Sequence, residues 1–334
     1  ITGIGALTPI GNTLDEYWEN LIAGKSGAAP ITHFDASKFK TQFACELKNF
    51  NPEDHFDRKE ARKLDPFAQY ALVTATEAWA DSGLDEEKIN LDRAGVIWGS
   101  GIGGLKTFYD ECTEFALGDG TPRFNPFFIP KMIADIAGGH ISMKWNLRGP
   151  NFTTVSACAS STNSLIDSFN YIRLGHADII VSGGSEAAVT QAGVGGFNAM
   201  KALSQRNDSP ETASRPFDLD RDGFVLGEGS GCLIVEELEH ALARGAKIYA
   251  EIVGGGMSAD AHHITAPHPE GLGAINVMRN ALRDAGMQPN DIDYINVHGT
   301  STPLGDIAES KAIREVFGED AFKLNISSTK SMTG

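Results

Sequence analysis

Short apolar runs typical of buried strands alternate along this chain with segments of helical periodicity, and this alternation limits the fold more than any other feature. The runs that predict strands are residues 95–98, 179–181, 231–235, 248–253 and 294–297. The segments that predict helices are residues 66–82, 159–174, 273–285 and 306–317. Strands and helices in alternation pack as layers, so we expect an α/β fold.

The two halves of the chain show a weak internal similarity. The paired segments that run from a strand into glycines or into small polar residues are 1–5 with 252–256 and 155–158 with 326–329. This pairing indicates a duplicated α/β unit. We expect a first domain over residues 1–247 and a second over residues 248–334, with no low-complexity linker between them.

The composition is typical of a globular protein, and the net charge argues against some classes of binding partner. With 334 residues, 41% of them hydrophobic, the chain can bury one large or two ordinary cores. Its formal net charge of −16 argues against general binding of nucleic acid, which needs a basic face. No apolar run reaches the roughly 18 residues that span a membrane, so we expect no membrane insertion.

Cysteine usage indicates the redox compartment. The four cysteines, at positions 45, 112, 158 and 232, lie far apart and form no CxxC pair, so neither a disulfide framework nor a cysteine zinc site is indicated. A reducing compartment follows, and we expect the cytoplasm. The sequence begins at Ile1 inside an expected strand and without Met, so an organelle stays open if a targeting peptide has been removed.

Cys158 lies among small residues, after a β-branched run and directly before an amphipathic helix. Apolar residues at helical spacing follow it, which places the thiol at or just before a helix N-terminus. Free N–H groups there favour a thiolate and can hold a developing oxyanion. Cys158 is therefore a candidate nucleophile; the alternative is that it is a small buried hydrophobe, as many cysteines are.

Other patterns indicate pockets and turns more than cofactor sites. Residues 99–104 match GxGxxG after a strand, but the acidic residue expected about twenty positions on is replaced by a loop at 118–122. Residues 183–187 lack the final glycine of a serine nucleophile elbow. Three histidines near Asp260 fit neither HExxH nor zinc-finger spacing: His262, His263 and His268.

A second candidate site element is His298, which ends an apolar strand inside a turn rich in hydroxyl groups. A histidine in this position can present one imidazole nitrogen to a substrate, or it can be an ordinary core histidine. The third element is Lys330, which lies among serines and threonines after another expected strand. A lysine so enclosed is typical of a fixed positive charge or hydrogen-bond donor.

These three elements, with further blocks along the whole chain, resemble the β-ketoacyl-acyl carrier protein synthases, the type I/II condensing enzymes of fatty acid synthesis. Among these enzymes, the sequence is most similar to the type II enzymes. The matching blocks are residues 1–5, 125–130, 147–150, 155–161, 214–218, 221–225, 298–303 and 327–334. So many blocks in order are more specific than any single motif.

The resemblance implies a thiolase-like fold, in which two similar α/β halves form a duplicated five-layer αβαβα arrangement, and a homodimer. It also implies the reaction, a decarboxylative condensation of malonyl-carrier protein with an acyl group, which lengthens fatty acids by two carbons. The reaction needs neither a metal nor a nucleotide, so we expect no cofactor.

The resemblance also implies the roles of the site residues. Cys158 is the acyl-accepting nucleophile, and His298 contacts the thioester carbonyl of malonyl-carrier protein to promote decarboxylation. Lys330 holds the charge and orientation of the histidines. The residues implied in binding the phosphopantetheine arm and the acyl chain are Thr300, Thr302 and Ile102. Thioester chemistry itself favours a thiol, which is both a soft nucleophile and a good leaving group.

The chain departs from the family pattern at its end. In the family, a second catalytic histidine directly follows the Ser-Met-Thr-Gly turn, whereas this chain ends at Gly334 in that turn. We therefore expect the C-terminal half to be incomplete, lacking that histidine and the phenylalanine-bearing loop that gates the pocket.

The implied partner, the acyl carrier protein, is acidic, so an acidic synthase must meet it through local positive charge. We expect docking through Lys59, Arg62 and Lys63, which share one face of an expected helix, with Arg123 and Lys201 as further candidates. The alternative for each of these residues is an ordinary solvated charge.

Three other functions stay open. A thiolase shares the fold, but the combination of His298 with Lys330 favours a decarboxylating synthase. A polyketide ketosynthase shares the chemistry. A chain-length partner subunit of a polyketide system would be non-catalytic and lack the nucleophile, whereas Cys158 is present.

Overall fold

The computed structural model describes residues 1–334, which form two compact units. The units are made of interleaved segments because the chain passes between them several times. The first unit comprises residues 1–22, 47–193 and 228–252, and the second comprises residues 23–46, 194–227 and 253–334. The domain boundary expected near residue 247 stays a prediction.

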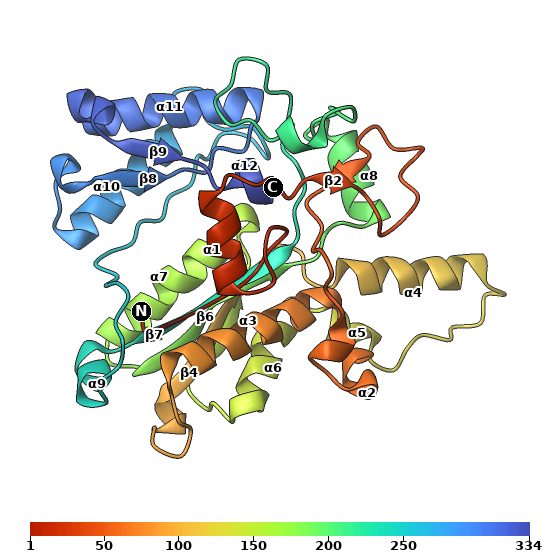
Figure 1. The fold of residues 1–334 in the computed structure, drawn as a ribbon, viewed down its shortest axis with the longest axis horizontal. Helices are drawn as coiled ribbons and strands as arrows, with labels where there is room; N and C mark the ends of the chain where they lie inside the picture. The colour runs from red at the N-terminus through yellow and green to blue at the C-terminus, as the bar shows by residue number, and fades with distance from the viewer. The chain divides into compact units, whose positions relative to one another are not determined.

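The first unit contains a five-stranded mixed sheet in the order β1-β7-β6-β4-β5 (Figure 1). Strands β6, β4 and β5 run parallel, whereas β7 pairs antiparallel with both β6 and β1. The parallel strands end at one edge of the sheet, where their loops carry the candidate nucleophile. The strands are β1 (Gly3–Leu7), β4 (Ala94–Gly99), β5 (Asn151–Thr154), β6 (Ile179–Glu186) and β7 (Gly229–Glu236).

Helices cover both faces of this sheet because successive residues of a strand point to opposite sides. Val96 and Trp98 of β4 pack in the core with α3 and α6, while Ile97 packs in a second core with α7. Full burial of such side chains stabilises the fold by about 1.5–3 kcal/mol each. The helices of this unit are α1 (Leu14–Ile22), α2 (Arg58–Ala61), α3 (Pro66–Ser82), α4 (Leu105–Leu117), α5 (Phe128–Met132), α6 (Ile136–Trp145), α7 (Ser160–Arg173) and α9 (Leu238–Ala243).

The two ends of α3 show how individual residues determine where a helix begins and ends. The Asp65 side chain accepts the Phe67 N–H, and Pro66 occupies the first helical position, where its missing N–H costs nothing. Gly83 ends the helix in the left-handed conformation, with φ 64°. The helix predicted over residues 66–82 is confirmed with both of its ends.

The second unit has two small two-stranded sheets and a helical layer. Strands β8 and β9 are parallel, and the Val297 side chain that follows β8 is buried with Ile313 and Phe317 of α11. The elements of this unit are β2 (Ala29–Pro30), β3 (Phe43–Ala44), β8 (Tyr294–Asn296), β9 (Asn325–Ser327), α10 (Leu272–Ala285), α11 (Pro303–Phe317) and α12 (Lys330–Thr333), and α8 (Gln191–Ala199) spans the division between the units.

Most predicted elements are confirmed, and two expectations are wrong. Residues 248–253 form no strand, because their pairing is limited to Ile1, whose backbone exchanges hydrogen bonds with Tyr249 and Ala250 at 2.8 Å each. Strand β8 exists but is not buried, since it belongs to a sheet of only two strands and Tyr294 stays exposed. An apolar run predicts an extended chain, but a strand also needs a partner.

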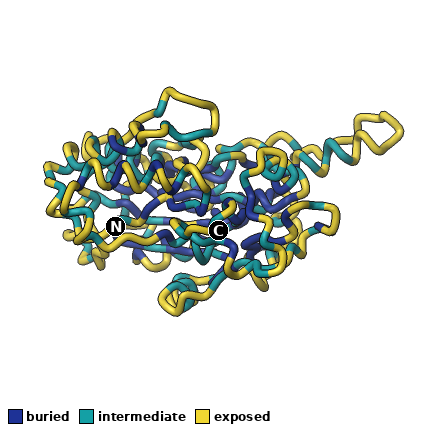
Figure 2. Tube along the Cα trace, turned by 90° about the horizontal axis from the view of Figure 1, so that it is seen from above, coloured by how far each residue is buried: buried dark blue, intermediate teal, exposed yellow.

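The α/β class is confirmed, whereas the duplicated five-layer arrangement stays a prediction. Buried residues form the dark stretches of the trace in Figure 2, with exposed loops between them. None of the helices combines the length and the hydropathy that crossing a membrane requires.

Candidate active site

Cys158 lies in a short turn of the first unit, between the end of β5 at Thr154 and the start of α7 at Ser160. Its side chain is exposed, whereas Cys45 and Cys232 are buried. Burial raises the pKa of the Cys232 thiol well above its ordinary value, so Cys232 stays protonated and unreactive. Exposure therefore distinguishes Cys158 from Cys45 and Cys232, and it excludes the alternative that Cys158 is a small buried hydrophobe.

The turn around Cys158 is held by its neighbours' hydroxyl groups. Ser160 Oγ accepts the Ser156 N–H at 2.9 Å and donates to the Ala157 carbonyl at 2.7 Å, while Thr154 Oγ1 donates to the Ser160 carbonyl at 2.8 Å. These bonds keep Ala157 in the left-handed region, with φ 50°, which costs a residue other than glycine about 1–2 kcal/mol. Strain of this kind persists where the surroundings impose it, commonly at functional sites.

Glycines let the first turn of α7 lie directly against the sheet. A Cβ on Gly99 of β4 would lie 2.6 Å from the backbone of Ser160 and Ser161, and a Cβ on Gly184 of β6 would meet Ser161 Oγ at 2.0 Å. No larger residue fits at either position. The glycine-rich sequence predicts close backbone approach, and the structure identifies the element approached as the helix that follows the candidate nucleophile.

Ile102 lies on the turn after β4, where residues 99–104 match GxGxxG, and its side chain is 45% exposed. The N–H groups of Gly101, Ile102 and Gly103 all donate to the Glu186 carboxylate. An internal carboxylate thus uses the donors that a nucleotide-binding loop would offer to phosphate. This supports the interpretation of residues 99–104 as a tight turn, whereas its place in the wall of a pocket stays a prediction.

His298 lies in the second unit, directly after β8. The backbone N–H groups of His298 and Gly299 donate to Oε1 and Oε2 of Glu309 on α11, each at 2.7 Å. A charged carboxylate that accepts two N–H groups makes strong, well-directed bonds. Glu309 therefore fixes the backbone of His298, which carries the imidazole.

Lys330 is brought to the same edge of the second unit, because β8 and β9 are parallel neighbours and their carboxyl ends lie side by side. Ser328 Oγ joins the two loops by donating to the Gly299 carbonyl at 2.9 Å. The pKa of His298 lies below its ordinary value, first because the surrounding protein removes water and second because of the positive charge of Lys330. His298 is thereby kept as a neutral imidazole.

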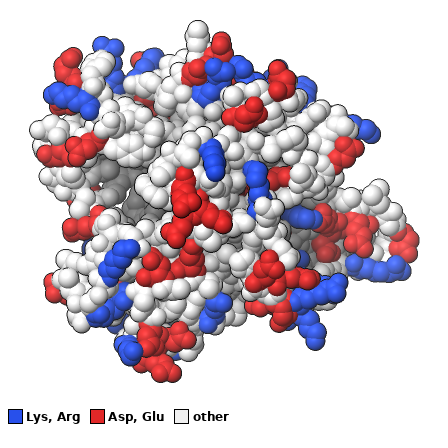
Figure 3. All heavy atoms as spheres, viewed as in Figure 1, with Lys and Arg blue, Asp and Glu red and all other residues white.

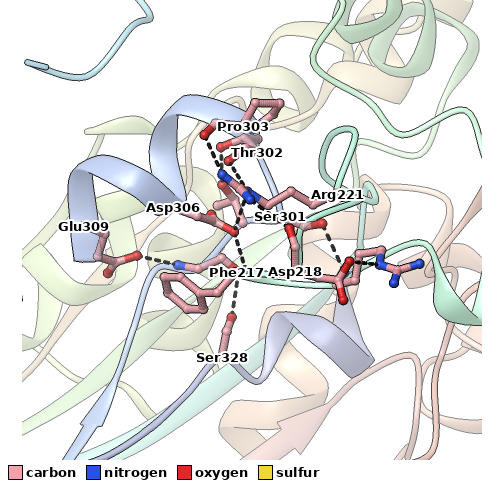
Figure 4. Close-up of polar contacts among 12 residues, drawn as sticks. Phe217, Asp218, Arg221, Ser301, Thr302, Pro303, Asp306, Glu309 and Ser328 are labelled. Carbon is pink, nitrogen blue, oxygen red and sulfur yellow. Dashed lines mark hydrogen bonds and ion pairs between the residues drawn. The ribbon is translucent and has the colours of Figure 1, made fainter. Parts of the chain in front are cut away.

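A buried ion pair supports the loop that follows His298. Arg221 and Asp306 approach to 3.4 Å, and Asp306, which is 2% exposed, also accepts the Phe217 N–H at 2.7 Å (Figure 4). Arg221 further donates to the carbonyls of Thr302 at 3.1 Å and Pro303 at 2.7 Å. Together these contacts fix the backbone of the loop that contains Thr302.

The two threonines predicted to meet the substrate lie together in the second unit, where the Thr300 and Thr302 hydroxyl oxygens are 3.0 Å apart. Ser301 between them is fully buried with φ 65°, and its Oγ accepts the Arg215 N–H at 3.0 Å. The buried middle residue leaves the flanking hydroxyl groups as a pair.

Sequence reasoning missed the carboxylates and the arginine behind these loops. Glu309, Asp306 and Arg221 lie in the blocks that carry the family resemblance or just after them, and no role was assigned to them. Their signal was present: two acidic residues three apart at the start of a helix that follows a histidine turn share one helix face.

The residues predicted to dock a carrier protein are exposed, but one expectation about them is wrong. Lys59, Arg62 and Lys63 do not share one helix, because α2 ends at Ala61. The chain must then extend at Asp65, whose backbone is restricted by Pro66. Lys63 Nζ lies 5.5 Å from the centre of the Phe127 ring instead.

The remaining docking candidates lie apart in the chain. Arg123 of the first unit forms an exposed ion pair with Asp119 at 3.4 Å, and Lys201 of the second unit is exposed beyond the end of α8. Figure 3 shows acidic side chains gathered at several places on this face, with basic side chains scattered between them. The docking role of these residues stays a prediction.

The predicted site residues thus fall into two groups. Cys158 and Ile102 belong to the first unit, whereas His298, Thr300, Thr302 and Lys330 are brought together in the second. Each group is held by backbone hydrogen bonds to a carboxylate and contains a turn residue with positive φ, Ala157 in the first unit and Ser301 in the second.

Two family models match the chain: the β-ketoacyl synthase N-terminal domain over residues 1–241 and the β-ketoacyl synthase C-terminal domain over residues 249–334. The 3-oxoacyl-[acyl-carrier-protein] synthase 2 of Coxiella burnetii is 51% identical over 334 residues, which are 100% of this chain and 80% of that protein. The protein of the same description from Staphylococcus aureus is 52% identical over 335 residues, covering 100% and 82%.

Solved structures agree. A β-ketoacyl synthase from Burkholderia phymatum superposes with a TM-score of 0.91 at 36% identity, covering 100% of this chain and 81% of that one. The ishigamide ketosynthase/chain length factor superposes with a TM-score of 0.90 at 35% identity, covering 100% and 80%. The chain therefore belongs to the β-ketoacyl synthase family. It is an acyltransferase of the 3-oxoacyl-[acyl-carrier-protein] synthase type, which confirms the family and the function that its motifs predict.

Proposed function

We propose that Cys158 carries the acyl group in this reaction and that His298 and Lys330 act on the malonyl thioester. The observation that carries the proposal is the Cys158 turn, in which an exposed thiol at the start of α7 follows a strained residue. The thiolate attacks the carbonyl carbon of the acyl-carrier protein thioester. The bond to the carrier's sulfur breaks, and the carrier leaves as a thiol after taking up a proton.

Decarboxylation of malonyl-carrier protein follows. The bond between the α-carbon and the carboxylate breaks, carbon dioxide leaves, and the electron pair forms an enolate on the thioester. A neutral imidazole can donate a hydrogen bond to the enolate oxygen, and the low pKa of His298 beside Lys330 keeps it neutral. The enolate carbon then attacks the acyl carbonyl on Cys158, a carbon–carbon bond forms, and the cysteine sulfur leaves as thiolate.

The product is a 3-oxoacyl-carrier protein two carbons longer than the acyl donor. The Thr300 and Thr302 pair offers hydroxyl groups to the polar phosphopantetheine arm. Ile102 offers an exposed apolar side chain to the acyl chain. All steps are balanced without an added oxidant, metal or nucleotide.

A Cys158→Gln variant tests this division of roles. We expect it to lose condensation completely while still releasing carbon dioxide from malonyl-carrier protein, because His298 and Lys330 lie on other loops. His298→Ala is the matched variant, and it is expected to lose decarboxylation while Cys158 still accepts an acyl group. Loss of both activities in each properly folded variant would contradict the assignment.

The partner is an acyl carrier protein, which docks at Lys59, Arg62 and Lys63. All three are exposed and close in sequence. Replacing them together by glutamate should raise the KM for carrier protein and leave kcat unchanged. Lys88→Glu is the control, because Lys88 lies beyond the other end of the 17-residue helix α3, about 25 Å away by helix rise. An unchanged KM in the triple variant rules out this docking face.

We further infer a homodimer with the duplicated five-layer arrangement of the thiolase-like fold. Strand β5 supports it, because it is an edge strand with one unpaired side. The free thiols support a reducing compartment, the cytoplasm. Light scattering on the eluting protein tests the dimer, and a monomer mass would contradict it.

Fatty acid elongation is favoured over polyketide synthesis by the higher identity to the fatty acid enzymes, 51% and 52% against 35% for the ishigamide protein. The chain-length partner role is disfavoured by the presence of an exposed cysteine at position 158.

A further inference from the structure

Glu186, at the end of β6, holds a loop by three consecutive backbone groups. Its Oε2 accepts the N–H of Gly101 at 2.7 Å and of Ile102 at 3.1 Å, and its Oε1 accepts the N–H of Gly103 at 3.3 Å. Ser100 Oγ completes the arrangement, because it accepts the Gly103 N–H at 3.1 Å. Bonds from N–H groups to a charged carboxylate are about twice as strong as bonds between neutral groups, so one side chain determines the path of three residues.

The loop held in this way lies against the turn of the proposed nucleophile. A Cβ on Gly101 would lie 3.0 Å from Glu186 Oε2 and 3.4 Å from the Ala157 carbonyl oxygen, so Gly101 is enclosed between the carboxylate and the residue before Cys158. The next residue, Ile102, keeps its apolar side chain 45% exposed. Glu186 therefore sets where Ile102 stands relative to the Cys158 turn.

Neither the strand nor the sheet requires this carboxylate. Strand β6 is paired over its whole length with β7 and with β4 over residues 179–184. The Glu186 backbone belongs to the β7 ladder, while its side chain crosses to the loop after β4. The carboxyl group thus serves the loop and not the sheet that carries it.

We propose that Glu186 is a positioning residue that sets the acyl-length selectivity of this enzyme, by holding Ile102 at a fixed place beside the Cys158 turn. The proposal rests on the proposed function of Cys158 as acyl acceptor. A pocket wall that is held rigidly discriminates between chains that differ by a few methylenes, whereas a loose wall adjusts to each of them.

Glu186→Gln tests the proposal with little change in volume. The amide replaces one acceptor oxygen by an NH₂ donor that faces a backbone N–H, so at least one of the three bonds is lost. Glu46→Gln is the matched control, because the Glu46 carboxylate likewise accepts backbone N–H groups, those of Thr32 and His33, but it lies in the second unit. Short-, medium- and long-chain acyl-carrier proteins are compared by their kcat/KM for acylation.

We expect the ratio of kcat/KM between the best and the worst donor to fall about tenfold in Glu186→Gln and to stay unchanged in Glu46→Gln. An unchanged ratio in Glu186→Gln overturns the proposal, and so does an equal fall in the control. If Glu186→Gln does not fold, Gly101→Ala gives the same comparison, because its added methyl group presses on the carboxylate.

Hydrogen exchange distinguishes failure of this proposal from failure of the proposed function. The amides of residues 101–103 should be protected in the wild type and exchange at least about tenfold faster in Glu186→Gln. If Cys158 accepts no acyl group in the wild type but this exchange difference is found, the nucleophile assignment fails while the loop clamp stands. Equal exchange in both proteins overturns the clamp itself.

Discussion

Gly99→Ala provides a direct test of how the sheet positions Cys158. Gly99 is the last residue of β4, and the first turn of α7 rests on its backbone. An added Cβ would lie 2.6 Å from the carbonyl carbon of Ser160 and from the backbone nitrogen of Ser161, whereas ordinary contacts begin near 3.4 Å. The helix start must move away by about 0.8 Å, because neither backbone atom belongs to a flexible side chain.

This displacement determines the size of the effect. Overpacking of this kind costs about 1–3 kcal/mol in stability. Misplacing a reacting group by about 1 Å can cost about 10²-fold in rate. Since Cys158 lies two residues before Ser160, we expect its acylation to slow by about 10²-fold while most of the protein stays folded.

The assay measures the rate at which acyl-carrier protein acylates the enzyme, by mass spectrometry of quenched samples, together with the thermal unfolding midpoint. Gly231→Ala is the control, because Gly231 lies on β7 of the same sheet and has no atom within 4 Å of an added Cβ. We expect wild-type acylation from the control. Wild-type acylation by Gly99→Ala would refute the view that this contact positions the thiol.

Three further predictions concern the second unit. Arg221→Met leaves the buried Asp306 carboxylate without its cation, which should lower the free energy of unfolding by about 3–5 kcal/mol in urea titrations. Adding Asp306→Asn removes the unpaired charge and should restore most of the lost stability. A double variant no more stable than the single one would contradict the ion pair's role. The pKa of His298 is lowered, so the unfolded state takes up this proton first as the pH falls below the ordinary histidine value of about 6.5. The free energy of unfolding, measured by urea titration at several pH values, should therefore decrease from about pH 6.5 down through the lowered pKa of the folded state. Lys330→Met removes the nearby positive charge and should move the acid limb of the decarboxylation rate to higher pH, and a limb that stays in place would exclude that electrostatic effect.

Local signals allowed much of the fold to be predicted. The helix over residues 66–82 could be predicted from its periodicity, and the structure shows its ends fixed locally by Asp65, Pro66 and Gly83, because caps act within a few residues of the helix end. The expected strand over residues 248–253 failed for the opposite reason. Its apolar residues describe an extended segment, but whether such a segment finds a partner along its length depends on distant parts of the chain.

The candidate site shows the same limit. Cys158, His298 and Lys330 could be selected as candidate site residues because each lies in a distinctive run of small or hydroxyl residues. The groups that hold these runs in place could not, since Glu186 reaches a loop 85 residues away in sequence and Arg221 reaches one 81 residues away. Contacts of such separation leave no periodicity in a single sequence. The strain at Ala157 is likewise set by its neighbours and not by its own residue type.

Transfer of the acyl group to Cys158 is tested most directly by peptide mapping with mass spectrometry. The protein is incubated with an acyl-carrier protein, quenched in acid and digested. We predict one added acyl mass on the peptide that contains Cys158, and none on peptides that contain Cys45, Cys112 or Cys232. An adduct on another residue, or an enzyme that condenses while Cys158 stays unmodified throughout turnover, would contradict it.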